Sequence, residues 1–148
     1  MGIASSSVAV VAIVLACERF FPDSYEATFS NYEEALRQNA VGPHIPRSAI
    51  DIRMGSTREG SERWLAFRAP MLDIAAMVRS RSCTRVAENG VEFPRDTSYA
   101  PKGWPTALTL GGKKGDRQYE YYRCYPRSFT GSFTAVDPQH AEVFEWNL

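Results

Sequence analysis

Three turn sequences in the second half of the chain constrain its fold most strongly. Each lies between short segments that are rich in β-branched and aromatic residues, which favour strands. Asn89-Gly90, inside "TRVAENGVEF", is the strongest short hairpin signal. The sequence "GGKKGD" at 111–116 makes a longer tip, and "DPQH" at 137–140 separates "SFTAV" from "AEVFEW". We therefore predict three antiparallel hairpins between residues 84 and 146.

The first half of the chain predicts two helices that flank a further pair of strands. In "SNYEEALRQNAVGP", residues 30–43, Ser30 and Glu33 have the spacing of a capping box, and Gly42-Pro43 would end the helix. The segment 48–54, "SAIDIRM", alternates apolar and polar residues as a half-buried strand does. A returning strand, "RWLAFRA", follows, and Pro70 fits the first turn of a second helix.

These patterns also name the residues that should face a core. They are Tyr32, Ala35, Leu36 and Ala40 in the first helix, Ile50, Ile52 and Met54 in the strand, and Met71, Ile74, Ala75 and Val78 in the second helix. The chain of 148 residues suits one domain. We expect a single α+β domain, with an antiparallel sheet built of hairpins and about two helices packed on it.

Net charge argues against nucleic acid as a partner. Lys and Arg number 17, as do Asp and Glu, so the formal net charge is zero. Proteins that bind phosphate backbones need an excess of positive charge, which this chain lacks. Nucleic acid is therefore not an expected ligand.

The N-terminal segment has the features of an export signal. Nothing charged precedes Glu18, and nine apolar residues run from Val8 to Ala16. Val14-Leu15-Ala16-Cys17 resembles a bacterial lipobox, in which a small residue precedes the cysteine that receives the diacylglycerol. Two departures weaken the match: the segment has no Lys or Arg, and Leu15 stands where a smaller residue is usual.

Three other interpretations of this segment remain open. A transmembrane helix would need about 20 apolar residues, more than are present. A buried β-strand would account for the Val and Ile content, and "MGIASS" fits an N-myristoylation pattern with Gly2 as the acceptor. The export interpretation leads to a signal peptide at 1–16, a tether at 17–29 and a folded domain at 30–148. A lipid on Cys17 would then anchor the protein in the cell envelope, facing the periplasm, with the outer membrane favoured.

The two remaining cysteines, Cys83 and Cys124, bear on the same question. An exported chain in an oxidising compartment would be expected to pair them. The alternative is that both are buried free thiols. We predict the disulfide, and this prediction depends on export.

Motifs that would indicate catalysis are missing from the sequence. His44 and His140 lie in proline-marked loops without metal-ligand spacing. "LGGKKGD" lacks the spacing of a phosphate-binding loop, and no nucleophile elbow occurs. The carboxylates at Asp51, Glu92, Asp116, Glu120 and Asp137 are spread along the chain. We therefore expect no catalytic residue, cofactor or metal.

One basic, tyrosine-rich stretch is a candidate binding face. It comprises Lys113, Lys114, Arg117, Tyr119, Tyr121, Tyr122 and Arg123. Arginine and aromatic residues dominate the energetics of protein interfaces, so this stretch could contact a partner. The alternative is an ordinary strand of a small protein.

The segment "IPRSAIDIR…ERWLAFRAP" resembles the front half of a group of small, uncharacterised bacterial exported proteins. The residues that carry the resemblance are the pairs Ser48-Ala49, Asp51-Ile52, Trp104-Pro105 and Val136-Asp137, together with Trp64, Phe67 and the ending Val143-Phe144-Glu145-Trp146. The likeness spans residues 45–146 and implies a common fold and export. It brings no catalytic residue.

These observations favour a non-enzymatic envelope protein that is tethered by Cys17 and binds another envelope protein, for example as an inhibitor or immunity-type module. The alternative is a small envelope hydrolase or carbohydrate-binding enzyme that uses scattered carboxylates and aromatic platforms. Two carboxyl groups about 5 to 9.5 Å apart in an aromatic-lined cleft would favour the enzyme. An aromatic and arginine-rich patch without a cleft would favour the binding module.

Overall fold

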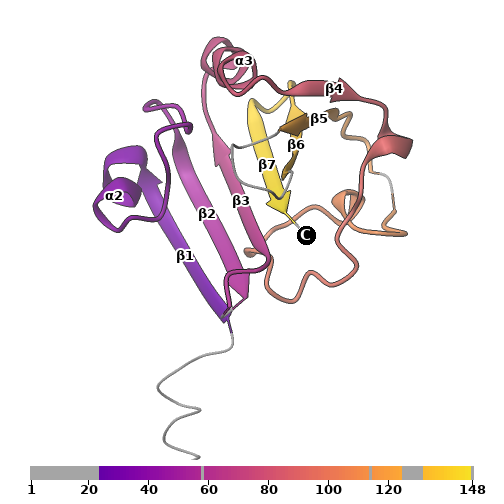
Figure 1. Cartoon of the computed structure of the whole chain (residues 1–148), viewed down its shortest axis with the longest axis horizontal. Coiled ribbons are helices and arrows are strands. Elements are labelled where there is room, and N and C mark those ends of the chain that lie inside the picture. The colour runs from indigo at the N-terminus through magenta and orange to yellow at the C-terminus, as the bar shows by residue number, and fades with distance from the viewer. Residues whose placement is uncertain (1–23, 58, 114, 125–131, 148) are drawn as a thin grey trace, which may run out of the picture.

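A seven-stranded antiparallel sheet organises the chain in the computed structural model, which describes residues 24–57, 59–113, 115–124 and 132–147 (Figure 1). The strand order is β1-β2-β3-β7-β6-β5-β4. The strands are β1 (Ser24–Asn31), β2 (Ile50–Thr57), β3 (Arg63–Arg68), β4 (Thr84–Val86), β5 (Glu120–Cys124), β6 (Ser132–Asp137) and β7 (Glu142–Asn147). The expected single α+β domain is confirmed at this level, and the sheet dominates it. The expected signal peptide, 1–16, and Cys17 lie outside the described residues.

Both α-helices cover one side of the sheet, here called the helix face, onto which Ile52, Phe67 and Val143 project. The helices are α2 (Tyr32–Arg37) and α3 (Met71–Ser80). Their buried residues, Tyr32 and Ala35 in α2 and Ile74 and Met77 in α3, belong to the same apolar cluster as those strand residues. Burial of this surface supplies the main stabilising free energy of this layer.

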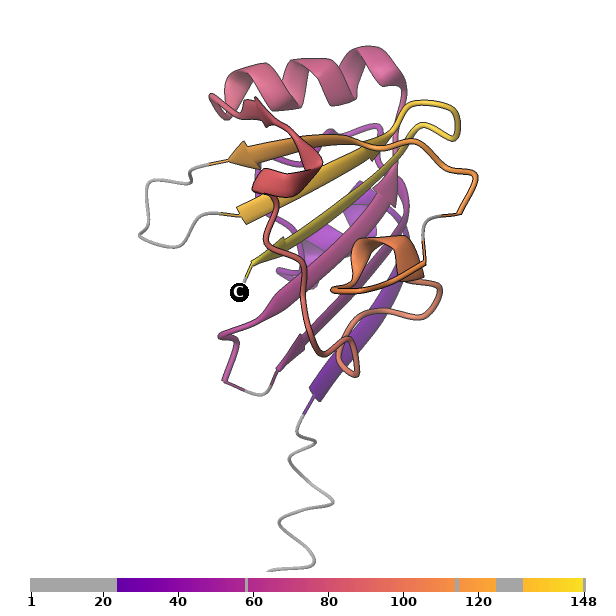
Figure 2. The same ribbon diagram turned by 90° about the vertical axis from the view of Figure 1, so that its right-hand side faces the viewer.

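An irregular segment, comprising residues 87–113 and 115–119, covers the other side of the sheet (Figure 2). This tryptophan face is formed by Trp64, Phe144 and Trp146, each buried. Phe93 stacks on Trp146 with ring centroids 6.0 Å apart, and Trp104 meets Phe144 edge-on at 5.5 Å. Aromatic side chains thus fill this layer in place of a helix.

Two of the three predicted hairpins are wrong. Asn89 and Gly90 lie in a 3-10 turn, Glu88–Gly90, because Val91 and Phe93 pack on the tryptophan face instead of pairing with β4. Strand β4 pairs with β5.

The second predicted hairpin, around 111–116, is also absent. Thr106–Leu108 forms a 3-10 turn whose Leu108 is fully buried, and β5 pairs with β4 and β6. The third pair, β6 and β7, is adjacent and antiparallel, with Val136 opposite Val143.

The segment before α2 differs from the expected tether at 17–29. Residues 24–29 belong to β1, which forms one edge of the sheet. The helix cap also lies one residue later than predicted. The Asn31 side chain accepts from the Glu34 amide at 3.0 Å, and the Glu34 carboxylate accepts from the Ser30 amide at 2.9 Å. Asn31 is therefore the N-cap, the Glu34 carboxylate reaches back to Ser30 instead of to the cap residue, and the helix ends at Arg37.

Strand β2 contains an irregularity that overturns one predicted core residue. The register shifts between Ile50 and Arg53, and Asp51 has a positive φ of 52°. Ile50 is consequently 45% exposed, whereas Ile52 and Met54 are buried as predicted. Leu36, also expected in the core, is 41% exposed because the short helix α2 turns only Tyr32 and Ala35 inward.

Candidate functional site

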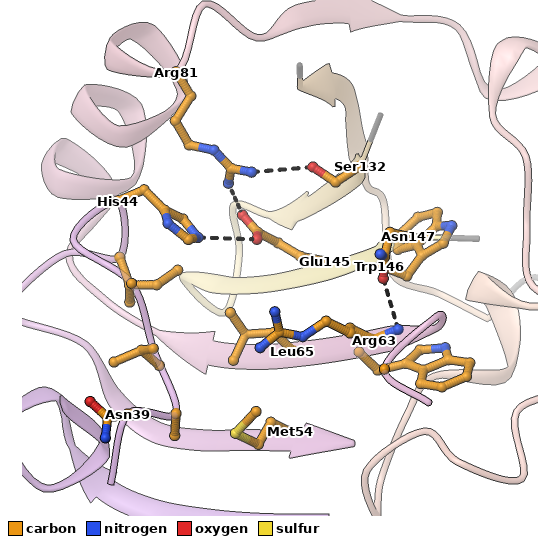
Figure 3. Close-up of a pocket in the computed structure, with 16 residues that line it drawn as sticks. Asn39, His44, Met54, Arg63, Leu65, Arg81, Ser132, Glu145, Trp146 and Asn147 are labelled. Atoms are coloured by element: carbon orange, nitrogen blue, oxygen red, sulfur yellow. Dashed lines mark hydrogen bonds and ion pairs between the residues drawn. The ribbon is translucent and has the colours of Figure 1, made fainter. Parts of the chain in front are cut away.

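An open groove of about 540 Å³ lies on the helix face, between the loop after α2 and the C-terminal end of α3 (Figure 3). Strands β3 and β7 run beneath it. Its lining includes Asn39, Val41, His44, Ile45, Met54, Arg63, Leu65, Arg81, Ser132, Glu145 and Asn147. The volume is within the usual range of ligand sites, about 300 to 1,000 Å³.

One wall of the groove is a buried ion pair between Arg81 and Glu145. Their side chains are only 13% and 9% exposed. Arg81 also donates to the Ser132 hydroxyl at 3.2 Å, and the Thr134 hydroxyl donates to Glu145 at 3.5 Å. A buried carboxylate needs such partners to offset its lost hydration. The pair thus fixes both side chains.

His44 stands beside this pair, on the loop that follows α2. Its Nε2 is 4.0 Å from the Glu145 carboxylate, and its side chain is 41% exposed. Burial lowers the pKa of His44; Glu145 opposes this shift, while Arg81 and Arg63 add to it. The charged imidazolium is therefore disfavoured, and the imidazole is mainly neutral at neutral pH.

Arg63 provides the exposed charge of the groove. Its backbone amide donates to the Asn147 side chain at 2.7 Å, which fixes the start of β3 against the end of β7. Within the described part of the chain, no carboxylate lies within ion-pair distance of the Arg63 guanidinium. The groove floor near it is apolar and includes Met54 and Leu65.

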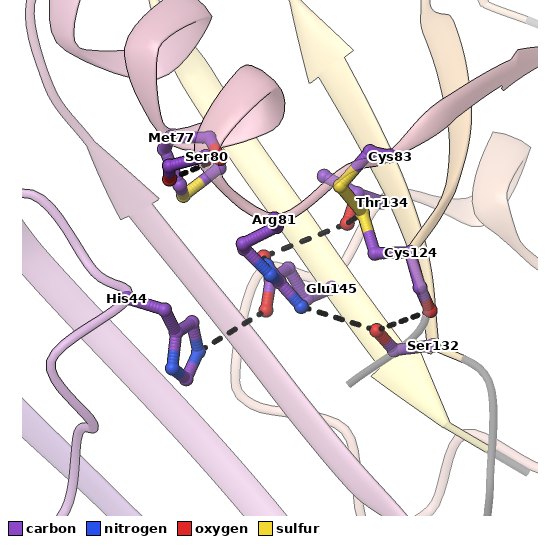
Figure 4. Close-up of a disulfide and its surroundings, with 9 residues drawn as sticks. All are labelled: His44, Met77, Ser80, Arg81, Cys83, Cys124, Ser132, Thr134 and Glu145. Atoms are coloured by element: carbon purple, nitrogen blue, oxygen red, sulfur yellow. Dashed lines mark hydrogen bonds and ion pairs between the residues drawn. A yellow bond between two sulfur atoms is a disulfide. The ribbon is translucent and has the colours of Figure 1, made fainter. Parts of the chain in front are cut away.

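A disulfide holds the end of α3 near the groove (Figure 4). Cys83 is bonded to Cys124, so the predicted pairing is present. Cys83 follows Arg81 by two residues, and Cys124 is completely buried in β5. The Thr134 hydroxyl lies 3.4 Å from the Cys124 sulfur and also contacts Glu145. The bond therefore ties the segment that bears Arg81 to the sheet beneath.

A second charged cluster lies on the tryptophan face and joins the covering segment to the sheet. Arg117 contacts both Asp137, at 3.4 Å, and Glu142, at 2.8 Å, and the hydrogen bond to Glu142 raises the pKa of Arg117. Arg53 binds Glu142 at 2.6 Å and donates to the Lys102 carbonyl at 3.0 Å. His140 Nδ1 lies 2.7 Å from Asp137. One guanidinium therefore bridges the two carboxylates.

The basic, tyrosine-rich stretch is divided between the two faces of the sheet. Tyr119 and Tyr121 pack on the tryptophan face, where burial raises the pKa of Tyr121 to about 12. Tyr122 lies on the opposite face, and its hydroxyl donates to Glu120 at 2.9 Å.

The charged members of that stretch are also dispersed. Arg123 lies 5.1 Å from the centroid of the Phe133 ring and donates to the Gly90 carbonyl at 3.2 Å. Arg117 belongs to the cluster described above, Lys113 is exposed, and Lys114 lies outside the described residues. The structure does not bring the set together as one surface.

Sequence reasoning did not find the groove, because its lining residues come from six separate segments without a motif. One signal was present in "EVFEW". Val143 points into the core, so alternation places Glu145 on the same side, where an apolar residue is usual. A charged residue at an inward position indicates a partner brought by tertiary structure.

No family model, no curated protein and no solved structure matches this chain. Within the described ranges, no helix has the length and apolar character required to cross a membrane. The same ranges contain no group of three or more His, Cys, Asp or Glu residues that could hold a metal ion.

Proposed function

We propose that this chain is an exported, lipid-anchored envelope protein whose domain binds another protein through the groove on the helix face. The observation that supports this proposal most directly is the combination of an apolar floor, at Met54 and Leu65, with the exposed cation of Arg63. Apolar contacts and arginine side chains are the groups that dominate protein interfaces. An inhibitor or immunity-type role falls within this class.

The arrangement of carboxylates favours binding over the alternative of a sugar-cleaving enzyme. Among the described lining residues of the groove, Glu145 is the single carboxylate, and Arg81 already pairs with it. Asp137 and Glu142 are close to each other but share Arg117 on the other face. Glycoside hydrolysis requires two carboxyl groups on either side of one scissile bond.

The anchor in this proposal is the lipid expected on Cys17. Strand β1 begins at Ser24, so seven residue steps separate the two positions. A chain spans at most about 3.6 Å per residue, which limits this spacer to about 25 Å. A lipid there would hold the sheet close to the membrane surface. The disulfide is consistent with an oxidising compartment.

Intact mass tests the anchor. The protein is purified from native membranes and measured before and after reduction with alkylation. We expect a chain that begins at Cys17, carries acyl-glyceryl mass, and has two cysteines that are alkylated only after reduction. A full-length chain with three freely alkylated cysteines would contradict export, lipidation and the disulfide together.

Photo-crosslinking tests the groove. A benzophenone amino acid is placed at His44, inside the groove, and in a matched variant at Lys102, which is exposed over the tryptophan face. We expect a discrete adduct in intact cells from position 44 that is absent from position 102. Excess unlabelled full-length protein should compete for the adduct. Equal adducts from both positions, or none from position 44, would overturn the proposed groove.

A further inference from the structure

We infer that the groove binds a segment of the partner that carries acidic and apolar side chains on one side, with a carboxylate of that segment paired to Arg63. This inference rests on the proposed function, since it specifies the chemistry of the partner at the same groove. Three features of the described residues support it: the charge balance of the groove, its apolar floor and the position of His44.

The charge balance of the described lining residues is positive. Arg63 and Arg81 contribute two positive charges and Glu145 one negative charge, which leaves +1 with neutral His44. The Arg81 charge is already paired with Glu145 in the wall of the groove. Arg63 is exposed and has no carboxylate partner in the described chain, so an incoming carboxylate would complete its ion pair.

The floor of the groove supplies an apolar contact surface for the partner. Met54 and Leu65 come from neighbouring strands and pack against the helix-face core, next to Val41 and Ile45 from the loop after α2. An apolar side chain that enters here would be removed from water against a preformed surface, at about 25 cal/mol per Å². Extended peptides place alternate side chains on opposite sides. Arg63 and Leu65 lie two residues apart on β3 and project from the same face, so the segment must present acidic and apolar side chains together on one side.

Protonation of His44 in mild acid should strengthen the preference of the groove for a carboxylate. The charged groups that face it are Glu145 from β7, Arg63 from β3 and Arg81 from the end of α3. The two arginines disfavour the imidazolium, and a bound carboxylate would add a second anion beside it. Binding should then take up a proton, so affinity should rise as the pH falls from 7.5 to 6.0.

The test uses the full chain in dodecyl maltoside micelles, labelled with ¹⁵N and followed by NMR. The probe is the blocked hexapeptide Glu-Glu-Leu-Leu-Glu-Glu, in which each side of the extended chain carries both residue types, and its control has glutamine in place of glutamate. We expect the acidic peptide to shift amide signals of β3, β7 and the loop after α2, with at least about tenfold higher affinity than the neutral peptide. The preference should increase at pH 6.0.

Matched variants identify which side chain contacts the carboxylate of the peptide. Arg63→Gln should reduce the affinity for the acidic peptide to that of the neutral one. Arg68→Gln is the control, because Arg68 lies on the same strand but points to the opposite face and is exposed in a pair with Asp51. His44→Gln should remove the increase at pH 6.0 while retaining binding at pH 7.5.

Equal affinities of the acidic and neutral peptides at the groove would overturn the carboxylate preference while supporting a peptide-binding groove. The absence of groove shifts with both peptides would also overturn the inference. The proposed function would then be decided independently by the adduct at position 44, which does not depend on the charge of the partner. Unchanged affinity in Arg63→Gln would show that this guanidinium is not the contact.

Discussion

The guanidinium of Arg81 binds the buried carboxylate of Glu145 across the helix face, and this pair joins the end of α3 to the centre of the sheet. Ser132 and Thr134 complete its hydrogen bonds. It forms one wall of the groove, so the stability of the domain and the shape of the proposed site depend on the same two side chains.

Removal of one partner of the pair should be far more damaging than removal of both. In Arg81→Leu, the Glu145 carboxylate stays buried without its cation, which should lower the free energy of unfolding by about 3 kcal/mol. The double variant Arg81→Leu/Glu145→Leu should recover most of that loss, because no buried charge remains. Urea denaturation of the four proteins in the cycle measures the coupling. Additive effects of the two substitutions would show that the pair has little energetic significance.

Loss of the disulfide should destabilise the domain and loosen one edge of its sheet. The bond closes a loop with a sequence separation of 41 residues, for which chain entropy gives about 4 kcal/mol as an upper figure. Strand β4 has only three residues and pairs only with β5, so it should open first. Thermal unfolding with and without reductant gives the stability change. Hydrogen exchange should increase in Thr84–Val86 before it does in β3, and uniform protection after reduction would contradict this order.

Stability should fall in mild acid because of His44. Its pKa is lower in the folded protein than the ordinary value of 6.5, so the unfolded chain takes up the proton at higher pH. The free energy of unfolding should therefore decrease as the pH falls through about 6.5 toward the folded pKa. His44→Gln should flatten this part of the profile between pH 7.5 and 6.0. Chemical denaturation at several pH values checks it, and an identical slope in the variant would assign the effect to other groups.

Substitution by alanine should lower the free energy of unfolding at one glycine, Gly55, and leave it nearly unchanged at another, Gly90. A Cβ on Gly55 would lie 1.9 Å from the Tyr99 carbonyl oxygen, so Gly55→Ala should cost about 3 kcal/mol by displacing the segment that covers the tryptophan face. A Cβ on Gly90 would meet only the Val86 side chain, at 3.9 Å, and Gly90 has no positive φ. Gly90→Ala should therefore be within about 0.5 kcal/mol of the parent. A large loss at Gly90 would instead support the hairpin that the Asn-Gly sequence predicts.

Local sequence patterns were reliable where neighbouring residues supplied the interaction. The strands β2 and β3, the helix after Pro70 and the turn between β6 and β7 depend on contacts a few residues apart, and all are present, although the alternation of β2 breaks at Ile50. The pairing of Cys83 with Cys124 was also predicted, from the expected compartment and not from geometry.

Tertiary packing decided the rest. Asn89-Gly90 has the local preference for a hairpin, but Phe93 stacks on Trp146 and does not extend a strand, and the covering segment lies where two hairpins were predicted. Tertiary packing also decided the structure of the groove. The sequence placed a glutamate at position 145 in a predicted strand, and only the folded sheet determined that it turns inward, that Arg81 meets it there and that Arg63 stays unpaired among the described residues. The physical reason is that a buried charge must find its partner across long sequence separations, which no local pattern specifies.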